Sequence, residues 1–334
     1  MIVITGGGTG GHLSIAKSLK EELNTRGIKP IFIGSANGQD RLWFQNDDGF
    51  EEKYFFDVRG VTNKKYLGKI ISLLKILYFS FKCLFIFRKH KIKKIVCVGG
   101  YSAAAASLAS ILGFKKLYIH EQNSKVGSLN KLLKPFAKEF FSSYITPSTP
   151  YPVAQKYFDI YRVRKNIKRV IFLGGSQGAK SINDFAIKLA PYLQLQDIDI
   201  IHQTGSRDFE RIKKEYESLN IEVDIFAFSN ELESKLQMSD FAVSRSGAGT
   251  MWELVASGVP TLFVPYPYAS ANHQYYNALD LFEKNLVFLM KDNELDVEVF
   301  KSYLKDDYIE ISEKLKGILS NNGTKKIIDI ILER

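Results

Sequence analysis

The sequence Met1-Ile-Val-Ile-Thr-Gly-Gly-Gly-Thr-Gly-Gly-His12 joins a run of β-branched residues to five glycines and a histidine. The run predicts a buried strand, the glycines predict a loop, and Ser14 to Leu23 is expected to form the next helix. Glycine tolerates positive φ and lets backbone N–H groups approach a ligand, and the following helix directs the positive end of its dipole to the same place. We therefore expect an anionic group at this loop.

The same glycines satisfy the dinucleotide-binding fingerprint, as Gly6-x-Gly8-x-x-Gly11. That fingerprint also requires an acid at the end of the second strand, where it holds the ribose. Here the second strand, Pro30-Ile-Phe-Ile-Gly-Ser35, ends in glycine and serine. The missing acid argues against a nicotinamide oxidoreductase.

The composition is that of a globular protein with two domains. The chain has 334 residues, 45% of them hydrophobic and 25% charged, and a net charge of +10. This length exceeds what one ordinary core supports. The two cysteines, Cys83 and Cys97, have no metal-type spacing, and the N-terminus has no signal-peptide pattern, so we expect an intracellular protein. The positive charge predicts an anionic partner: nucleic acid, acidic lipid or a phosphorylated substrate.

Strand-like runs recur along the chain and alternate with segments of helix length. This alternation predicts doubly wound parallel sheets of the α/β class. In the second half, Arg169-Val-Ile-Phe-Leu-Gly-Gly-Ser-Gln-Gly-Ala179 repeats the opening pattern of strand and glycine loop. The predicted strands are Ile2–Ile4, Ile31–Ile33, Lys94–Val98, Leu117–Ile119, Val170–Leu173, Ile198–His202, Val223–Phe226, Phe241–Ser244 and Thr261–Val264.

The two halves are joined by a connector, Tyr144-Ile-Thr-Pro-Ser-Thr-Pro-Tyr-Pro-Val153, whose three prolines fit neither a helix nor a central strand. We place the boundary near residues 153 to 168, with one domain over 1–155 and another over 165–318. The last helix, about 320–334, can return to the first domain. Ligands of open α/β sheets bind at the carboxyl ends of strands, so we expect the domains to face each other across a cleft.

The second domain contains a second candidate ligand site. Asp240-Phe-Ala-Val-Ser-Arg-Ser-Gly-Ala-Gly-Thr-Met-Trp-Glu-Leu-Val-Ala-Ser-Gly-Val-Pro260 is predicted to form a strand, a turn of small residues and a helix with Glu253 in its first turn. Such a turn allows a diphosphate to contact the helix N-terminus. The carboxylate of Glu253 can accept two hydrogen bonds from a ribose diol. The structural alternative is a glutamate that only complements the helix dipole.

Six motifs occur in order over nearly the whole chain. They are the glycine loop with His12, Gly99-Gly-Tyr-Ser102, His120-Glu-Gln-Asn123, Gly174-Gly-Ser-Gln-Gly-Ala179, Arg245-Ser-Gly-Ala-Gly-Thr-Met-Trp-Glu253, and His273-Gln274 with Asn277-Ala278. Together they resemble the MurG family of peptidoglycan N-acetylglucosaminyltransferases. The resemblance implies a GT-B fold and an inverting transfer of GlcNAc from UDP-GlcNAc to the C4 hydroxyl of lipid-linked MurNAc-pentapeptide (lipid I), which gives lipid II.

The family's donor-binding residues map onto positions of this sequence. The resemblance assigns the phosphates and ribose to the turn Ala248, Gly249, Thr250, Met251 and Trp252, and the uracil to the backbone at Ser229. The other residues that it assigns to UDP-GlcNAc are Thr9, Gly10, Gly11, Asn123, Ser176, Glu253 and Gln274.

One position departs from the family pattern. Many relatives carry an arginine for the nucleotide in the connector, whereas this chain has Ala154. Arg162 or Arg164 could replace that arginine at the diphosphate, or both could belong to a solvated basic segment.

Inverting transfer needs a base for the acceptor proton and a positive environment for the departing UDP. His12 is the favoured base because an imidazole is mostly neutral at cytosolic pH. A capping or buried structural histidine is the alternative. Glu121 is the competing base, although it could instead orient its loop.

We expect no metal and no cofactor, because helix N-termini and main-chain amides can stabilise UDP. Asp197-Ile-Asp199 resembles the D-x-D motif of metal-dependent transferases. Both acids would lie on one face of a strand at its amino end, away from the binding edge.

Apolar residues are dense from Ile70 to Phe87, while Lys75, Lys82 and Lys89 recur every seven residues. The spacing places these lysines on one helical stripe, with Ser72 beside them. No uncharged run reaches the length of a membrane span. A basic amphipathic helix in the lipid interface fits this pattern, and a core helix with a solvated lysine face is the alternative.

These features favour a peripheral protein on the cytoplasmic face of the bacterial inner membrane. Its expected partners are UDP-GlcNAc, lipid I and the anionic membrane surface, with cell-wall synthesis and division proteins as possible additions. Nucleic acid is disfavoured because the basic residues are scattered rather than interleaved with stacking aromatics. Another GT-B transferase with a UDP-sugar and a lipid acceptor, and a non-catalytic sugar-nucleotide binding protein, are the alternatives.

Overall fold

The computed structural model describes residues 1–61, 65–175, 178–229, 231–304, 307–319 and 322–333. The chain divides into an N-terminal unit, residues 1–153 with 322–334, and a C-terminal unit, residues 154–321. The predicted strand at the start of each half is present in each unit, and each unit contains one parallel sheet.

The sheet of the N-terminal unit has the strand order β3-β2-β1-β4-β5-β6 within the described residues. Val3, Ile33, Ile95 and other apolar side chains of its central strands are buried beneath the helices. The strands are β1 (Ile2–Thr5), β2 (Ile31–Ser35), β3 (Glu52–Phe56), β4 (Lys94–Cys97), β5 (Lys116–Glu121) and β6 (Glu139–Ser142). The helices are α1 (Gly10–Thr25), α2 (Asp40–Phe44), α3 (Tyr66–Lys89), α4 (Ala104–Leu112), α5 (Ser128–Leu133) and α14 (Gly323–Glu333), with short 3₁₀ turns at Tyr101–Ala103 and Lys134–Phe136.

The C-terminal unit repeats this topology with the order β12-β11-β10-β7-β8-β9. Its core is rich in aromatic residues, among them Phe172, Phe241, Phe300 and Tyr308. The strands are β7 (Arg169–Leu173), β8 (Asp199–Gln203), β9 (Asp224–Phe226), β10 (Phe241–Ser244), β11 (Thr261–Phe263) and β12 (Phe288–Leu289). The helices are α6 (Gln155–Asp159), α7 (Lys180–Leu195), α8 (Phe209–Ser218), α9 (Leu232–Met238), α10 (Ala248–Ala256), α11 (His273–Glu283), α12 (Val297–Tyr303) and α13 (Ile309–Ile318), with 3₁₀ turns at Ser270–Asn272 and Asp292–Glu294.

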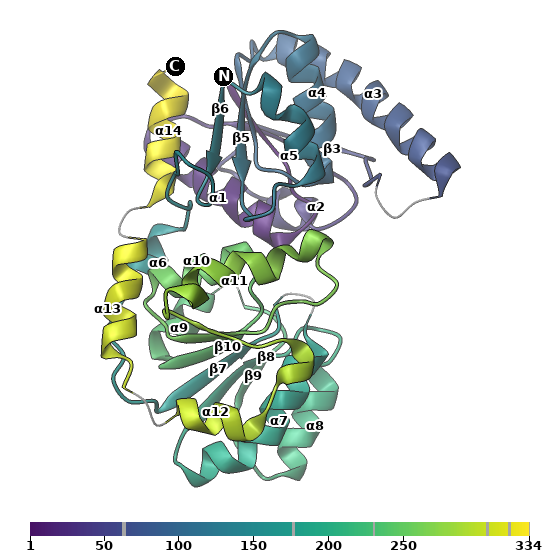
Figure 1. The fold of residues 1–334 in the computed structure, drawn as a ribbon. Helices are drawn as coiled ribbons and strands as arrows, with labels where there is room; N and C mark the ends of the chain where they lie inside the picture. Colours follow the sequence, from purple (N-terminus) through teal and green to yellow (C-terminus); the bar gives the residue numbers. More distant parts are fainter. Residues whose placement is uncertain (62–64, 176–177, 230, 305–306, 320–321, 334) are drawn as a thin grey trace. The chain divides into compact units, whose positions relative to one another are not determined.

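The final helix α14 belongs to the N-terminal unit, where it packs against α1 (Figure 1). Asp329 accepts a hydrogen bond from Arg26 at 2.6 Å, and the Lys94 ammonium donates to the carbonyl of Leu332 at 3.1 Å. The Gly323 amide donates to the Tyr151 carbonyl at 3.3 Å. A Cβ at Gly323 would collide with the Pro150 carbonyl, so glycine is required where this helix begins.

Three strands, β3, β6 and β12, were not predicted, and each lies at the edge of its sheet. Their side chains are mostly half-buried or exposed, because an edge strand has a neighbour on one side only. β3 and β6 also contain charged residues, whereas β12 lies within the apolar run Leu286–Met290, which the sequence analysis did not identify as a strand.

Candidate active site

Both sheets reverse their strand order at one place, between β1 and β4 in the N-terminal unit and between β7 and β10 in the C-terminal unit. Ligands of doubly wound folds bind at the carboxyl ends of the strands at such a switch point. The glycine loop with His12 follows β1, and the turn that leads into α10 follows β10. The two predicted ligand sites therefore lie at the switch points of their units.

The glycine loop is bound by a carboxylate from its own unit. Gly8 has a φ of +83°, and its N–H donates to Asp40 at 2.5 Å, while the Ser35 N–H donates to the other oxygen of Asp40 at 2.8 Å. Asp40 is fully buried, and its desolvation raises the pKa of this carboxyl, although the bound amides oppose the rise. The Gly8 N–H thus binds a carboxylate of its own unit, and the anionic ligand that the sequence predicted for this loop stays a prediction.

His12 lies in the first turn of α1, which begins at Gly10 and not at Ser14 as predicted. Its Nδ1 is 3.0 Å from the Thr9 hydroxyl, and its Nε2 is 3.0 Å from the Gln122 amide. A Cβ at Gly99, whose φ is +91°, would lie 3.0 Å from Nε2. The imidazole is partly exposed, so it is neither a capping residue nor a core histidine.

Glu121 is buried and organises the loop after β5. One oxygen accepts the Asn123 N–H at 3.0 Å, and the other accepts the Gly127 N–H and the Asn130 amide, each at 2.9 Å. These contacts fit the orienting role that the sequence left open. The neighbouring His120 is buried, and desolvation, followed by the nearby His12, lowers its pKa to about 3.

In the C-terminal unit, α10 begins at Ala248, so Glu253 lies in the second turn and not in the first as predicted. Ala248, Gly249, Met251 and Trp252 are buried, whereas Thr250 and Glu253 are partly exposed. Desolvation raises the pKa of Glu253 to about 7, although Lys156 and a hydrogen bond with Tyr157 oppose this rise. Neither Lys156 nor Tyr157 had been predicted as a neighbour.

The remaining donor residues lie on the loops after the strands. Gln274, at the start of α11, accepts the Tyr266 N–H at 2.9 Å, and its amide nitrogen lies near Gly247, the residue before α10. The Ser229 hydroxyl accepts the Glu231 N–H at 3.0 Å in the loop after β9. Ser176 lies outside the described residues. The structure thus groups Thr9, Gly10, Gly11 and Asn123 in one unit, and Ser229, Ala248–Glu253 and Gln274 in the other.

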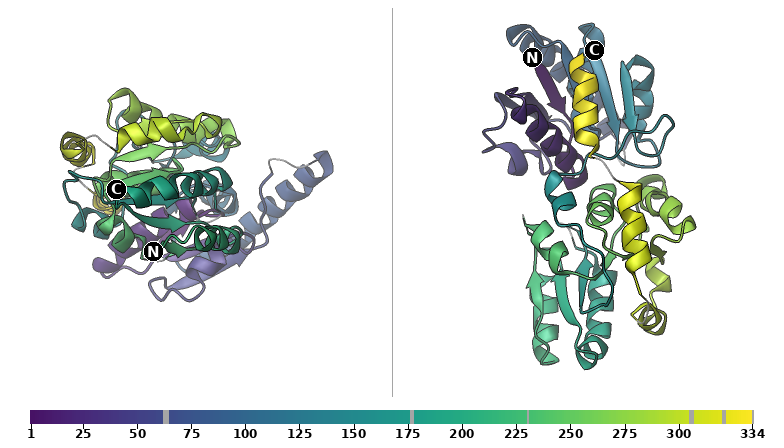
Figure 2. Two further views of the ribbon diagram at one scale, coloured as in Figure 1. Left: turned by 90° about the horizontal axis from the view of Figure 1, so that it is seen from below. Right: turned by 90° about the vertical axis from the view of Figure 1, so that its left-hand side faces the viewer.

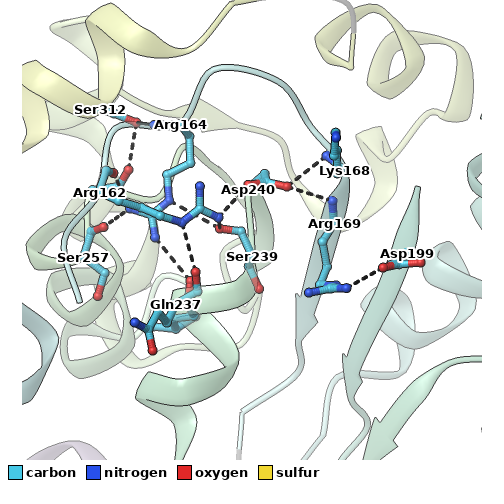
Figure 3. A network of polar contacts seen from close by, with 12 residues as sticks. Arg162, Arg164, Lys168, Arg169, Asp199, Gln237, Ser239, Asp240, Ser257 and Ser312 are labelled. Atoms are coloured by element: carbon cyan, nitrogen blue, oxygen red, sulfur yellow. Dashed lines mark hydrogen bonds and ion pairs between the residues drawn. The ribbon is translucent and has the colours of Figure 1, made fainter. Parts of the chain in front are cut away.

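Arg162 and Arg164 are held in a structural network, as Figure 3 shows. The guanidinium of Arg164 is buried and donates to the carbonyls of Ser239 at 3.3 Å and Leu236 at 3.2 Å, and also to that of Ser257. Arg162 pairs with Asp240 at 2.6 Å. Neither alternative that the sequence left open fits this network, because Arg164 is buried against carbonyls of its own unit and Arg162 pairs with an acid of that unit.

The acids of the D-x-D sequence do not share a strand face. Asp197 lies in a turn with a φ of +53°, whereas Asp199 opens β8 and pairs with Arg169 at 2.5 Å (Figure 3). Asp199 lies at the amino end of its strand, as predicted. Within the described ranges, no group of three His, Cys, Asp or Glu residues could hold a metal ion.

Helix α3 is long enough and apolar enough to cross a membrane by length and composition, yet only 28% of its most apolar window is buried. Ser72, Ser80, Cys83 and Phe87 form its buried face. In Figure 2 its N-terminal half projects from the rest of its unit. The exposed large apolar side chains, which we call the apolar face of α3, are Tyr66, Leu67, Ile70, Ile71, Leu73, Leu74, Leu77, Tyr78, Phe81 and Phe85.

The predicted lysine stripe differs in detail from the structure. Ser72 is buried instead of lying beside exposed lysines, and Lys75 pairs with Asp57 of the same unit. The Lys82 ammonium lies 4.8 Å from the centre of the Tyr78 ring, and Lys89 is exposed. The solvent side of α3 is therefore mainly apolar, and the lysines flank it.

Comparisons with known proteins agree with these motifs. The model of the glycosyltransferase family 28 N-terminal domain matches residues 2–142, and that of the C-terminal domain matches residues 169–329. The chain is 50% identical to a UDP-N-acetylglucosamine--N-acetylmuramyl-(pentapeptide) pyrophosphoryl-undecaprenol N-acetylglucosamine transferase of Campylobacter fetus, over 100% of both chains. The transferase of the same name from Wolinella succinogenes is 46% identical over 99% of both chains.

Among solved structures, that of Acinetobacter baumannii MurG superposes with a TM-score of 0.79 at 23% identity, covering 100% of this chain and 99% of the other. This similarity confirms the predicted GT-B fold. The matches to both domain models and to full-length relatives show that the protein is a glycosyltransferase of family 28 and belongs to its MurG branch.

Proposed function

We propose that the protein transfers GlcNAc from UDP-GlcNAc to the C4 hydroxyl of MurNAc in undecaprenyl-diphosphate-MurNAc-pentapeptide, giving lipid II for peptidoglycan. The observation that carries this proposal is the full-length identity of 50% to a transferase whose name states both substrates. The placement of His12 and the α10 turn at the two switch points supports it.

The C-terminal unit would bind the donor. The diphosphate would lie at the N-terminus of α10, over Gly247 to Trp252, where backbone N–H groups and the helix dipole favour negative charge. Glu253 would accept hydrogen bonds from the ribose hydroxyls, and the backbone near Ser229 would contact the uracil. Gln274, which is already aligned against Gly247, would contact the sugar nucleotide. The family resemblance also assigns Thr9, Gly10, Gly11 and Asn123 of the N-terminal unit, and Ser176, to UDP-GlcNAc, and these assignments stay predictions.

His12 would act as the base that removes the C4 proton of the acceptor while UDP departs. Its ring is partly exposed and is held by contacts at both nitrogens, which favours a defined orientation. Glu121 would act as a positioning residue, because amide donors from its own loop engage both of its oxygens.

The apolar face of α3 would lie in the lipid interface on the cytoplasmic side of the inner membrane, where a polyprenyl-linked acceptor is confined. Ten exposed large apolar side chains on one helix form a patch of the kind that marks an interaction surface. The buried face of Ser72, Ser80, Cys83 and Phe87 ties the helix to its own unit, which favours a peripheral arrangement over a span.

Turnover with UDP-GlcNAc and a lipid I analogue tests the proposal. We expect release of UDP and formation of a disaccharide lipid, and we expect activity to survive EDTA because amides and helix ends would stabilise UDP. Turnover only with a different lipid acceptor would make the protein another GT-B transferase. Donor binding without any turnover would make it a sugar-nucleotide binding protein.

A further inference from the structure

The imidazole of His12 is held from two sides that differ in solvent access. On one side, Nδ1 is 3.0 Å from the hydroxyl of Thr9, an exposed residue. On the other side, Nε2 is 3.0 Å from the amide of Gln122, which is 7% exposed. A substrate hydroxyl can therefore reach Nδ1 by displacing Thr9, whereas Nε2 is covered by Gln122.

The side-chain amide of Gln122 has two orientations that differ by a half-turn. Oxygen and nitrogen are not distinguished by shape, so the hydrogen-bond partners decide between them. With its nitrogen toward His12, the oxygen of Gln122 is buried and has no hydrogen-bond partner among the described residues. With the nitrogen toward His12, Nε2 of a neutral imidazole must accept the hydrogen bond, so Nδ1 carries the proton. With the oxygen toward His12, Nε2–H donates to it, and Nδ1 is unprotonated. Only the second orientation lets the solvent-accessible nitrogen take a proton.

We propose that Gln122 accepts a hydrogen bond from the Nε2–H of His12 and thereby holds the imidazole in the tautomer whose Nδ1 is unprotonated. Nδ1 then takes the acceptor proton, and the Thr9 hydroxyl occupies the place of the acceptor hydroxyl until substrate binds. Gln122 is a positioning residue in this scheme, because it acts through His12. The inference rests on His12 as the base of the proposed function and adds which nitrogen reacts.

The tautomer can be measured without any substrate. Nitrogen-15 NMR of the full-length protein labelled at histidine distinguishes a protonated ring nitrogen from an unprotonated one, and His12→Gln assigns the signals among five histidines. At a pH where His12 is neutral, we expect Nε2 to carry the proton. A proton on Nδ1 would overturn the proposal. This measurement needs no turnover, so it reports the tautomer of His12 even if the proposed function fails. The two failures can therefore be distinguished.

Two substitutions test the role of the amide oxygen in turnover. Gln122→Glu keeps an acceptor and should retain the Nε2–H tautomer, with a kcat within about threefold of the parent. Gln122→Met keeps the length but removes the acceptor, so kcat should fall at least about tenfold while KM for UDP-GlcNAc changes less than about twofold.

Gln155→Met is the matched control, because Gln155 is exposed on α6 and its side chain donates to Asp159 of the same helix. It should behave like the parent. A Gln122→Glu variant as impaired as Gln122→Met would overturn the proposal, and so would a Gln122→Met variant with parental kcat. Thermal unfolding of each variant distinguishes the loss of the hydrogen-bond acceptor at position 122 from a loss of the fold.

Discussion

The Asp40 carboxylate accepts the backbone N–H of Gly8 at 2.5 Å beneath the glycine loop. The acid that a dinucleotide site would use for ribose is absent from the end of β2, and this later acid binds the loop itself. A Cβ at Gly7 would lie 2.6 Å from the same carboxylate. The carboxylate of Asp40 therefore holds the loop in place.

Asp40→Ala should destabilise the protein by about 2 to 4 kcal/mol, because the N–H groups of Gly8 and Ser35 would lose a buried acceptor. Asp40→Asn keeps one acceptor oxygen and should lower the free energy of unfolding by less. Urea unfolding measures both values. Asp48→Ala is the control, since Asp48 is an exposed acid of the same segment. If Asp40→Ala and Asp48→Ala lowered the free energy of unfolding equally, the loop would not depend on this contact.

Glu253→Ala should weaken UDP-GlcNAc binding by roughly 2 to 4 kcal/mol, because two charge-assisted hydrogen bonds to the ribose are lost. Titration calorimetry gives the affinity directly. Glu233 also lies near this site, on α9, and Glu233→Ala is the matched control for a general change in local charge. Unchanged donor affinity in the Glu253 variant would reject the ribose role.

Glu253 should also make stability depend on pH. Its pKa is raised to about 7 in the folded protein, against about 4.3 in an unfolded chain. Between these values the native state binds more protons, so stability falls as pH rises through this window and the full loss is present above pH 7. Glu253→Gln does not titrate and should be more stable than the parent at pH 8 by about 1 to 3 kcal/mol. Urea unfolding at pH 5 and pH 8 tests this, and parallel profiles would contradict it.

His12→Ala should lower kcat by about 10²- to 10⁴-fold with little change in donor binding, the result of losing a general base. Steady-state kinetics with a lipid I analogue, together with UDP-GlcNAc calorimetry, separates the two effects. A rise confined to KM for the donor would make His12 a binding residue instead.

The apolar face of α3 should carry most of the membrane affinity. Replacing Leu74, Phe81 and Phe85 by serine removes three side chains that are 61%, 52% and 75% exposed, so folding should be retained. Binding to anionic vesicles should fall at least about 100-fold, since each side chain contributes about 1.5 kcal/mol or more. Leu195→Ser, at an exposed leucine of the C-terminal unit, is the control.

The lysines of α3 should make a smaller, salt-dependent contribution to the membrane affinity. Lys82→Glu with Lys89→Glu leaves the ion pair between Lys75 and Asp57 intact and should weaken vesicle binding most at low ionic strength. If the triple serine variant still sediments with vesicles like the parent, another surface contacts the lipid.

The sequence alone determined the central strands, the two glycine loops and the six motifs, because burial on both faces of a parallel sheet and the demands of a tight loop are visible in neighbouring residues. His12 and Glu253 could be found because each follows a loop of small residues directly after a predicted strand. The family arginine missing at Ala154 was equally visible, but the sequence did not show that Arg164 is buried against carbonyls of its own unit.

Only the tertiary structure decided the edge strands and the partners of the site residues. Asp40 and Gly8 are 32 positions apart, and Gln122 and His12 are 110 positions apart. Such pairs meet because the order β3-β2-β1-β4-β5-β6 brings the loops after β1, β2 and β5 to one edge of the sheet. Local periodicity reports which face of an element is buried, but the residue that covers that face depends on how the strands are ordered, which no local pattern contains.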